Sequence, residues 1–163
     1  MKYIHLEWQV NDEMRDVVTN ALNEEWEVTF YLHSQGGLWS SAEAIISMIN
    51  KNSDRVTLVA NNYIASNAFN IFFRAKCKRE VNEKTEWMAH MARIDTSMSG
   101  KRRIQSTPKW QMKNMWNEAK TEAKILKSLW CSKNIIKQFL NEYDVYFNTK
   151  KLRKMLNTQV WKT

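Results

Sequence analysis

The 163-residue chain is 44% hydrophobic, which is enough for one domain with its own core, and it is too short for two. Its formal charge of +8 is uneven, because residues 1–100 carry 10 basic and 13 acidic side chains whereas residues 101–163 carry 15 and 4. No apolar run reaches membrane-spanning length, and the start MKYIHLEWQV does not fit a signal peptide, so we expect a cytoplasmic protein without a membrane partner. Cys77 and Cys131 have neither metal-ligand nor disulfide spacing, so neither a metal site nor a cofactor is predicted.

The first part of the chain alternates predicted strands and helices. Alternation predicts a half-buried strand over residues 4–10, with the apolar face Ile4, Leu6, Trp8 and Val10. The Asn11-Asp12 pair can cap a helix over residues 14–22, and a second strand is predicted over residues 27–33. We expect that strand to end at the turn Ser34-Gln35-Gly36-Gly37, where paired glycines indicate a left-handed backbone or a close approach to a ligand.

A strand-helix-strand unit is predicted next. Ser40 and Glu43 form a capping box for a helix, and residues 56–60 have the composition of a buried strand. Strands joined in this way are parallel, so the glycine turn and the end of the third strand should lie at one edge of the sheet, where α/β proteins place their sites. A turn at Asn61-Asn62 then leads to a helix that begins near Ser66.

The remainder of the chain is predicted to be mainly helical. We expect short strands over residues 77–81 and 85–91, a polar loop over 96–108, a long helix from Lys109, a helical segment over 134–143 and a short helix over 149–156. The long helix carries a stripe of methionine and tryptophan, including Met112, Met115, Trp116 and Trp130. Such a stripe is typical of a core or a subunit interface.

Ser66 is the first candidate for chemistry. A serine at a strand-to-helix junction is commonly an N-cap, but it also lies among backbone N–H groups that can hold an oxyanion. His90 and Asp144 each follow the end of a predicted element, so the chain contains the three residue types of a hydrolytic triad. Spacing alone favours the N-cap interpretation.

Four segments resemble signature segments of the Clp protease proteolytic subunit family: HSQGG at 33–37, IASNAF at 64–69, WMAH at 87–90 and NEYDVYF at 141–147. The resemblance extends in order over residues 3–156. It implies an α/β fold of the ClpP/crotonase type, with repeated ββα units and a protruding handle helix. It also implies one domain over residues 1–163: a head over 1–100, a handle helix region over 108–143, and a C-terminal helix and tail over 144–163.

The resemblance assigns the site residues and implies no cofactor. Ser66 would be the nucleophile, His90 the base and Asp144 the residue that orients the histidine. Backbone N–H groups of Gly37 and Asn67 would bind the oxyanion, and Gly36, Leu38 and His33 would contact substrate. The implied function is a serine endopeptidase that cuts unfolded or flexible polypeptide inside an oligomeric chamber.

The resemblance also implies partners, namely a polypeptide substrate and further copies of the chain in rings. Family members stack rings of seven through the handle helix, which would explain the apolar stripe. The chain starts at its first strand, without the family's N-terminal segment that meets an unfoldase ATPase, so dependence on an ATPase stays open. The small, lysine- and asparagine-rich sequence suggests a bacteriophage or mobile-element gene.

Three other functions were weighed against the peptidase. Gln35 and Ala68 stand where the family has proline and glycine, which would suit a weakly active or inactive assembly or binding protein, for example a phage structural protein. The basic residues 101–163 could bind nucleic acid, but spaced lysines favour the solvated faces of long helices. An acyl-CoA-binding protein of the enoyl-CoA hydratase type would not require Ser66, His90 and Asp144 together.

Overall fold

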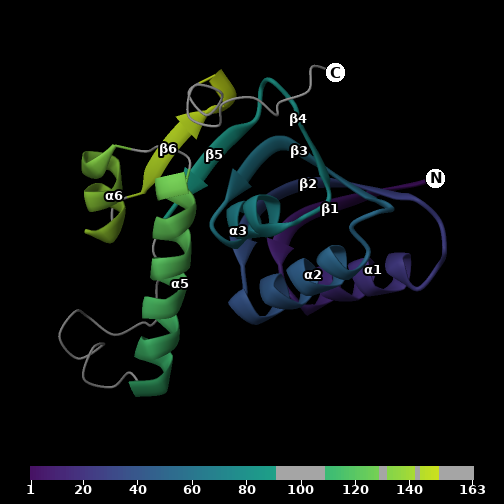
Figure 1. Ribbon diagram of the computed structural model, residues 1–163, viewed down its shortest axis with the longest axis horizontal. Helices are drawn as coiled ribbons and strands as arrows, with labels where there is room; N and C mark the ends of the chain where they lie inside the picture. Colours follow the sequence, from purple (N-terminus) through teal and green to yellow (C-terminus); the bar gives the residue numbers. More distant parts are fainter. Residues whose placement is uncertain (91–108, 129–131, 142–143, 151–163) are drawn as a thin grey trace.

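The computed structural model describes residues 1–90, 109–128, 132–141 and 144–150, and these residues form a mixed α/β fold (Figure 1). The strands are β1 (Lys2–Val10), β2 (Val28–Gly37), β3 (Val56–Ala65), β4 (Lys78–Val81), β5 (Glu86–Ala89) and β6 (Val145–Asn148). The helices are α1 (Asp12–Leu22), α2 (Trp39–Lys51), α3 (Asn67–Arg74), α5 (Lys109–Ser128) and α6 (Lys133–Leu140). The expected α/β class is confirmed.

A six-stranded sheet in the order β1-β2-β3-β5-β6 organises the molecule, and β4 also pairs with β3. The first three strands are parallel, as the strand-helix-strand pattern predicted. On the edge away from β2, β3 has two partners: its first half pairs with β4 from Thr57 to Ala60, and its end pairs with β5 from Tyr63 to Ala65. Asn62, between these two pairings, has a left-handed backbone with φ 53°. β6 returns antiparallel along β5.

The core lies between the sheet and the helices α1, α2 and α3, which pack on one face of it (Figure 1). Crossovers between parallel neighbours are right-handed as a general rule, and β1, β2 and β3 are adjacent in sequence order, which accounts for successive helices on the same side of the sheet. Aromatic side chains fill the part nearest β5: the Phe72 and Trp87 ring centroids lie 5.1 Å apart. The Trp87 indole N–H is satisfied by the Thr149 hydroxyl at 3.1 Å.

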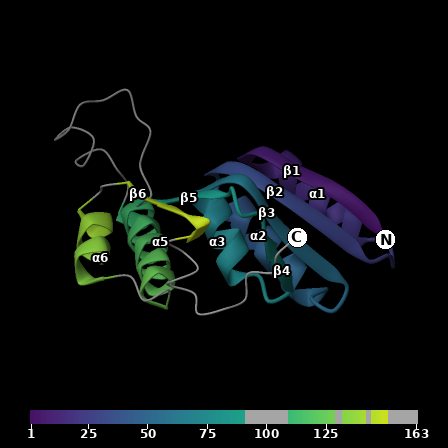
Figure 2. The same cartoon turned by 90° about the horizontal axis from the view of Figure 1, so that it is seen from above.

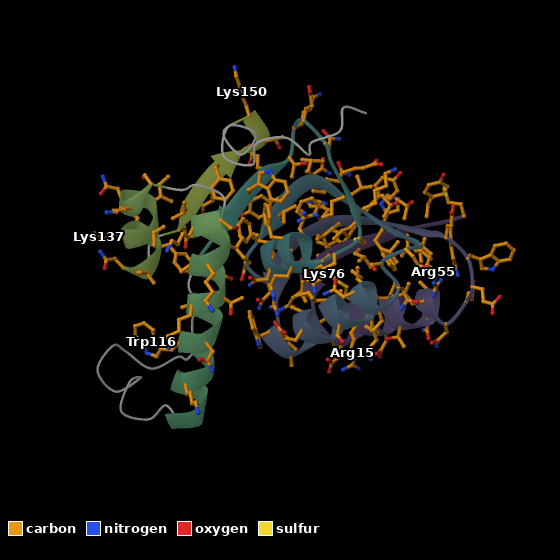
Figure 3. The ribbon with its side chains drawn as sticks, in the orientation of Figure 1. Arg15, Arg55, Lys76, Trp116, Lys137 and Lys150 are labelled. Atoms are coloured by element: carbon orange, nitrogen blue, oxygen red, sulfur yellow. The ribbon has the colours of Figure 1, made fainter. Side chains whose placement is uncertain are left out.

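The helices α5 and α6 lie beside β5 and β6, on the side of α3 and away from α1 (Figures 1 and 2). Leu126 of α5 and Phe139 of α6 are fully buried and join the main core. Trp116 on α5 is 54% exposed and Lys137 extends from α6 (Figure 3), so both helices present side chains to solvent. The long helix predicted from Lys109 is confirmed.

Three local predictions are wrong. The segment expected to turn at Ser34–Gly37 remains strand, because Gly36 and Gly37 pair with Gln9 and Val10 of β1. The turn at Asn61-Asn62 is likewise absent, since β3 runs through it to Ala65. The capping box is not formed: α2 has Leu38 at its N-cap position without a side-chain capping bond, and Glu43 pairs instead with Arg74.

A fourth difference concerns Trp8, which was predicted on the buried face of the first strand. The register between β1 and β2 shifts between Trp8 and Gln9, where Trp8 has φ 73° and is 77% exposed. This bulge turns the indole outward. Asn11, in contrast, is the predicted N-cap of α1, because its side chain accepts the Met14 N–H at 2.9 Å.

Some predictions lie outside the described residues: the loop over 96–108, the thiol of Cys131, the side chains of Met112, Met115 and Trp130, and all but the first two residues of the helix expected over 149–156. Within the described residues, no helix is long and apolar enough to cross a membrane, and no cluster of three or more metal-ligating side chains occurs.

Candidate active site

Ser66 occupies the single residue between β3 and α3, in a conformation that L-residues rarely adopt. Its φ of 52° and ψ of −125° make a sharp turn from strand to helix. Such a backbone costs a non-glycine residue on the order of 1–3 kcal/mol and is concentrated at functional sites. Ser66 stands at the N-cap position, but its side chain makes no capping hydrogen bond. The capping role that favoured a purely structural serine is therefore absent.

The glycine pair of β2 packs directly against this turn. A Cβ atom added to Gly36 would lie 2.5 Å from Ser66 Cβ and 2.9 Å from the Asn67 backbone nitrogen. Gly36 also has φ 94°, so both its backbone and its surroundings require glycine. The close approach to Ser66 explains Gly36, whereas Gly37 is required by β1, because a Cβ there would meet the backbone of Val10.

Hydrogen bonds hold the end of β2 that contains Gly36 and Gly37, here called the glycine segment, against the bulged end of β1. The Ser34 hydroxyl donates to the Trp8 carbonyl at 2.6 Å and accepts the Gly36 N–H at 3.1 Å. The Leu38 N–H donates to the Val10 carbonyl at 2.7 Å. The N–H groups on either side of Gly37 are therefore engaged in holding the segment.

The three predicted triad residues each lie at an end of one of three neighbouring strands, β3, β5 and β6. The Ser66 N–H donates to the Met88 carbonyl at 3.0 Å, which sets the serine beside the end of β5, two residues before His90. Ala89 pairs with Val145 across the antiparallel β5–β6 ladder. This pair closes the ladder, and His90 and Asp144 are the residues next to it, His90 after the end of β5 and Asp144 before the start of β6.

The surroundings of Asp144 are polar and aromatic. Its Oδ2 atom accepts a long hydrogen bond of 3.4 Å from the Tyr146 hydroxyl, and the residue is half-buried. Tyr63 of β3 lies within electrostatic reach: burial raises the pKa of its phenol, and the acidic groups of Tyr146, Asp144 and Glu86 raise that pKa further, because they disfavour a phenolate beside them.

The two predicted oxyanion donors are linked to each other. Asn67 begins α3, and N–H groups in the first turn of a helix have no partner within that helix. The Asn67 side-chain amide donates to the Gly37 carbonyl oxygen at 2.7 Å. One residue therefore supplies a first-turn N–H beside Ser66 and also holds the peptide group that follows Gly37.

The predicted substrate-contact residues differ in position. Gly36 touches Ser66, and Leu38, which directly follows the glycines, is 50% exposed. His33 is half-buried on β2 and pairs in register with Glu7 of the edge strand, on the face opposite Leu32 and the helices. A surface hollow of about 480 Å³ lies between β1 and α1, and no predicted site residue lines it.

Two site residues were missed from the sequence. Asn70 on α3 and Glu122 on α5 are buried and bonded to each other at 2.7 Å, and Asn70 also bonds to Asn67. A signal existed, because Asn70 interrupts the apolar run Phe69, Ile71 and Phe72, and Glu122 lies on the helical face of Ala119 and Leu126. Their hydrogen bond, which only the tertiary structure reveals, explains why a polar residue occupies each of these two buried positions.

Comparisons with known proteins agree with the fold. No protein-family model matches the chain, and no curated protein matches its sequence. Among solved structures, the chain is similar to a mutant ClpP1 from Listeria monocytogenes, with a TM-score of 0.67 and 18% sequence identity. The match covers 94% of this chain and 86% of that one. At this identity the likeness establishes a ClpP-like fold for the described part of the chain.

Proposed function

We propose that this chain is a serine endopeptidase in which Ser66 is the nucleophile, His90 the general base and Asp144 the residue that orients His90. The observation that carries the proposal is the convergence of β3, β5 and β6, which brings these three residues to one edge of the sheet around a strained, uncapped serine. Nucleophilic serines characteristically lie on such sharp strand-to-helix turns.

The proposed reaction gives each of these groups one role. His90 takes the Ser66 hydroxyl proton as Oγ bonds to the substrate carbonyl carbon, and the carbonyl oxygen becomes an oxyanion bound by the Gly37 and Asn67 N–H groups. The carbon–nitrogen bond then breaks, and His90 returns the proton to the leaving amine. Water hydrolyses the Ser66 ester by the same steps. Asp144 would hold the imidazole in the required tautomer and stabilise its charged form.

The proposed substrate is flexible polypeptide and the proposed assembly is a homo-oligomer. An extended chain can approach Ser66 past the exposed Leu38, whereas a folded one would meet the edge of the sheet. The ClpP-like fold and the 54% exposed Trp116 on α5 support contact between copies through this helix.

Labelling with a fluorophosphonate probe tests the nucleophile. We expect one adduct per chain on the peptide containing Ser66, detected by mass spectrometry, and hydrolysis of a fluorogenic unstructured peptide. Ser66→Ala and His90→Ala should abolish both signals, whereas Ser40→Ala, an exposed serine on α2, is the matched control and should leave them unchanged. Asp144→Asn should lower turnover by about 100-fold or more through the wrong histidine tautomer.

Two outcomes would contradict parts of the proposal. A folded, oligomeric sample with neither labelling nor turnover would refute the peptidase and favour a non-catalytic assembly protein of the same fold. Full turnover in Asp144→Asn would be compatible with the proposed roles of Ser66 and His90, but it would show that Asp144 is not needed for catalysis.

A further inference from the structure

A buried chain of side-chain hydrogen bonds connects α5 to the glycine segment. Glu122 Oε1 accepts from Asn70 Nδ2 at 2.7 Å, Asn70 Nδ2 donates to Asn67 Oδ1 at 3.0 Å, and Asn67 Nδ2 donates to the Gly37 carbonyl at 2.7 Å. The three side chains belong to residues that are 4%, 0% and 7% exposed, respectively. We call Glu122, Asn70 and Asn67 the amide relay.

The relay has only one consistent orientation. A carbonyl oxygen can only accept, so the Gly37 oxygen requires the NH₂ end of Asn67. This leaves the Asn67 oxygen facing Asn70, which must then present its own NH₂ group. The carboxylate of Glu122 accepts from that same NH₂ group, so the direction of every bond is set from both ends.

The position of the relay gives it a role beyond packing. A carboxylate in the core is costly and is tolerated when hydrogen bonds satisfy it. Here the bonded chain ends on the peptide group that follows Gly37, while Asn67 contributes the neighbouring first-turn N–H. Asn67 therefore carries one proposed donor on its own backbone and holds the carbonyl oxygen of the residue that carries the other, through a side chain whose orientation depends on Asn70 and Glu122.

We propose that Asn67, Asn70 and Glu122 are positioning residues, which aim the Gly37 and Asn67 N–H groups at the oxyanion by clamping the Gly37–Leu38 peptide. This inference rests on the proposed peptidase function for its catalytic consequence. The clamp itself, the coupling of Glu122 on α5 to the glycine segment of β2, does not depend on catalysis.

A conservative and a disruptive change at Glu122 separate positioning from bulk stability. Glu122→Gln keeps an oxygen that can accept from Asn70, and Glu122→Met keeps the volume but removes the acceptor. For a fluorogenic peptide, we expect kcat to fall about 10- to 100-fold in Glu122→Met with KM within about 2-fold, because the donors matter most in the transition state. Glu122→Gln should stay within about 3-fold of wild type in both parameters.

Hydrogen exchange supplies a readout that needs no activity. In Glu122→Met, amides of the peptide covering residues 34–40 should exchange at least 10-fold faster, and Glu122→Gln should match wild type. Asn67→Leu removes the clamp without touching α5, and it should show the same acceleration if Glu122→Met does not fold, as judged by circular dichroism.

Each result decides one question. Unchanged exchange over residues 34–40 in both folded disruptive variants overturns the relay, whether or not the protein is an enzyme. An equal loss of kcat in Glu122→Gln and Glu122→Met overturns it as well. Accelerated exchange in a protein whose wild type shows no turnover would support the relay and refute the peptidase.

Discussion

Gly36→Ala should uncouple the glycine segment from Ser66. The new Cβ would lie 2.5 Å from Ser66 Cβ, 2.8 Å from the Ala65 carbonyl oxygen and 2.9 Å from the Asn67 nitrogen, and ordinary contacts need about 3.4 Å or more. All three atoms belong to, or lie next to, backbone, so no flexible side chain can yield. The turn must therefore move by roughly 1 Å, a displacement that costs about 100-fold in rate when it misaligns reacting groups.

The same substitution has a stability cost. The left-handed φ of 94° adds about 1–2 kcal/mol for a residue with a Cβ. For a chain of this size that cost lowers Tm by roughly 2–8 °C. We expect folded protein with a modestly reduced Tm and a rate of Ser66 labelling by fluorophosphonate about 100-fold below that of wild type.

Arg55→Ala is the matched control for this experiment. Arg55 binds backbone carbonyls at the end of α1 and the start of β2, far along the strands from Ser66, so its loss destabilises the fold without touching the site. The rate of Ser66 labelling is compared between the two variants. If this rate in Gly36→Ala equals that of wild type, or is no lower than that of Arg55→Ala at equal Tm, the packing of the glycine segment against Ser66 does not control the reactivity of Ser66.

Four further outcomes are expected. Arg55→Ala should lower the free energy of unfolding by about 2 kcal/mol in urea titrations, because the guanidinium donates to the carbonyls of Leu22, Glu24 and Trp26 at 2.6–2.8 Å (Figure 3); a loss below 0.5 kcal/mol would contradict this. The thiol of Cys77 should react with iodoacetamide at pH 8 about 100-fold more slowly than an ordinary cysteine, because burial raises its pKa to about 11, and its peptide should gain reactivity only as the pH rises towards that value. The same pKa shift makes stability fall as pH rises from about 9 towards 11, since only the unfolded chain ionises freely there. Trp116→Glu should shift the sedimentation coefficient towards a smaller species while Tm changes little, and an unaltered oligomer would exclude the exposed face of α5 as a contact.

Periodicity and chain connectivity were sufficient for the general layout. Alternating residues identified the first strand, Asn11 identified the start of α1, and the strand-helix-strand order required parallel neighbours. The strand β6 was not foreseen, because four residues after a helix carry too little periodicity to be recognised. Trp8 was misplaced for a related reason: a bulge reverses the side that an alternating pattern predicts.

The sequence by itself determined which residues could take part in chemistry, since Ser66, His90, Asp144 and the paired glycines are visible in the chain. Tertiary structure decided how they relate. Pairing with β1 keeps Gly36 in a strand against Ser66, and the antiparallel pairing of β5 with β6 brings the end of β5, before His90, next to the start of β6, after Asp144. The partnership of Asn70 with Glu122 spans 52 residues. Contacts between distant segments depend on strand register and on helix packing, and neither can be predicted from the secondary-structure propensity of short stretches of sequence.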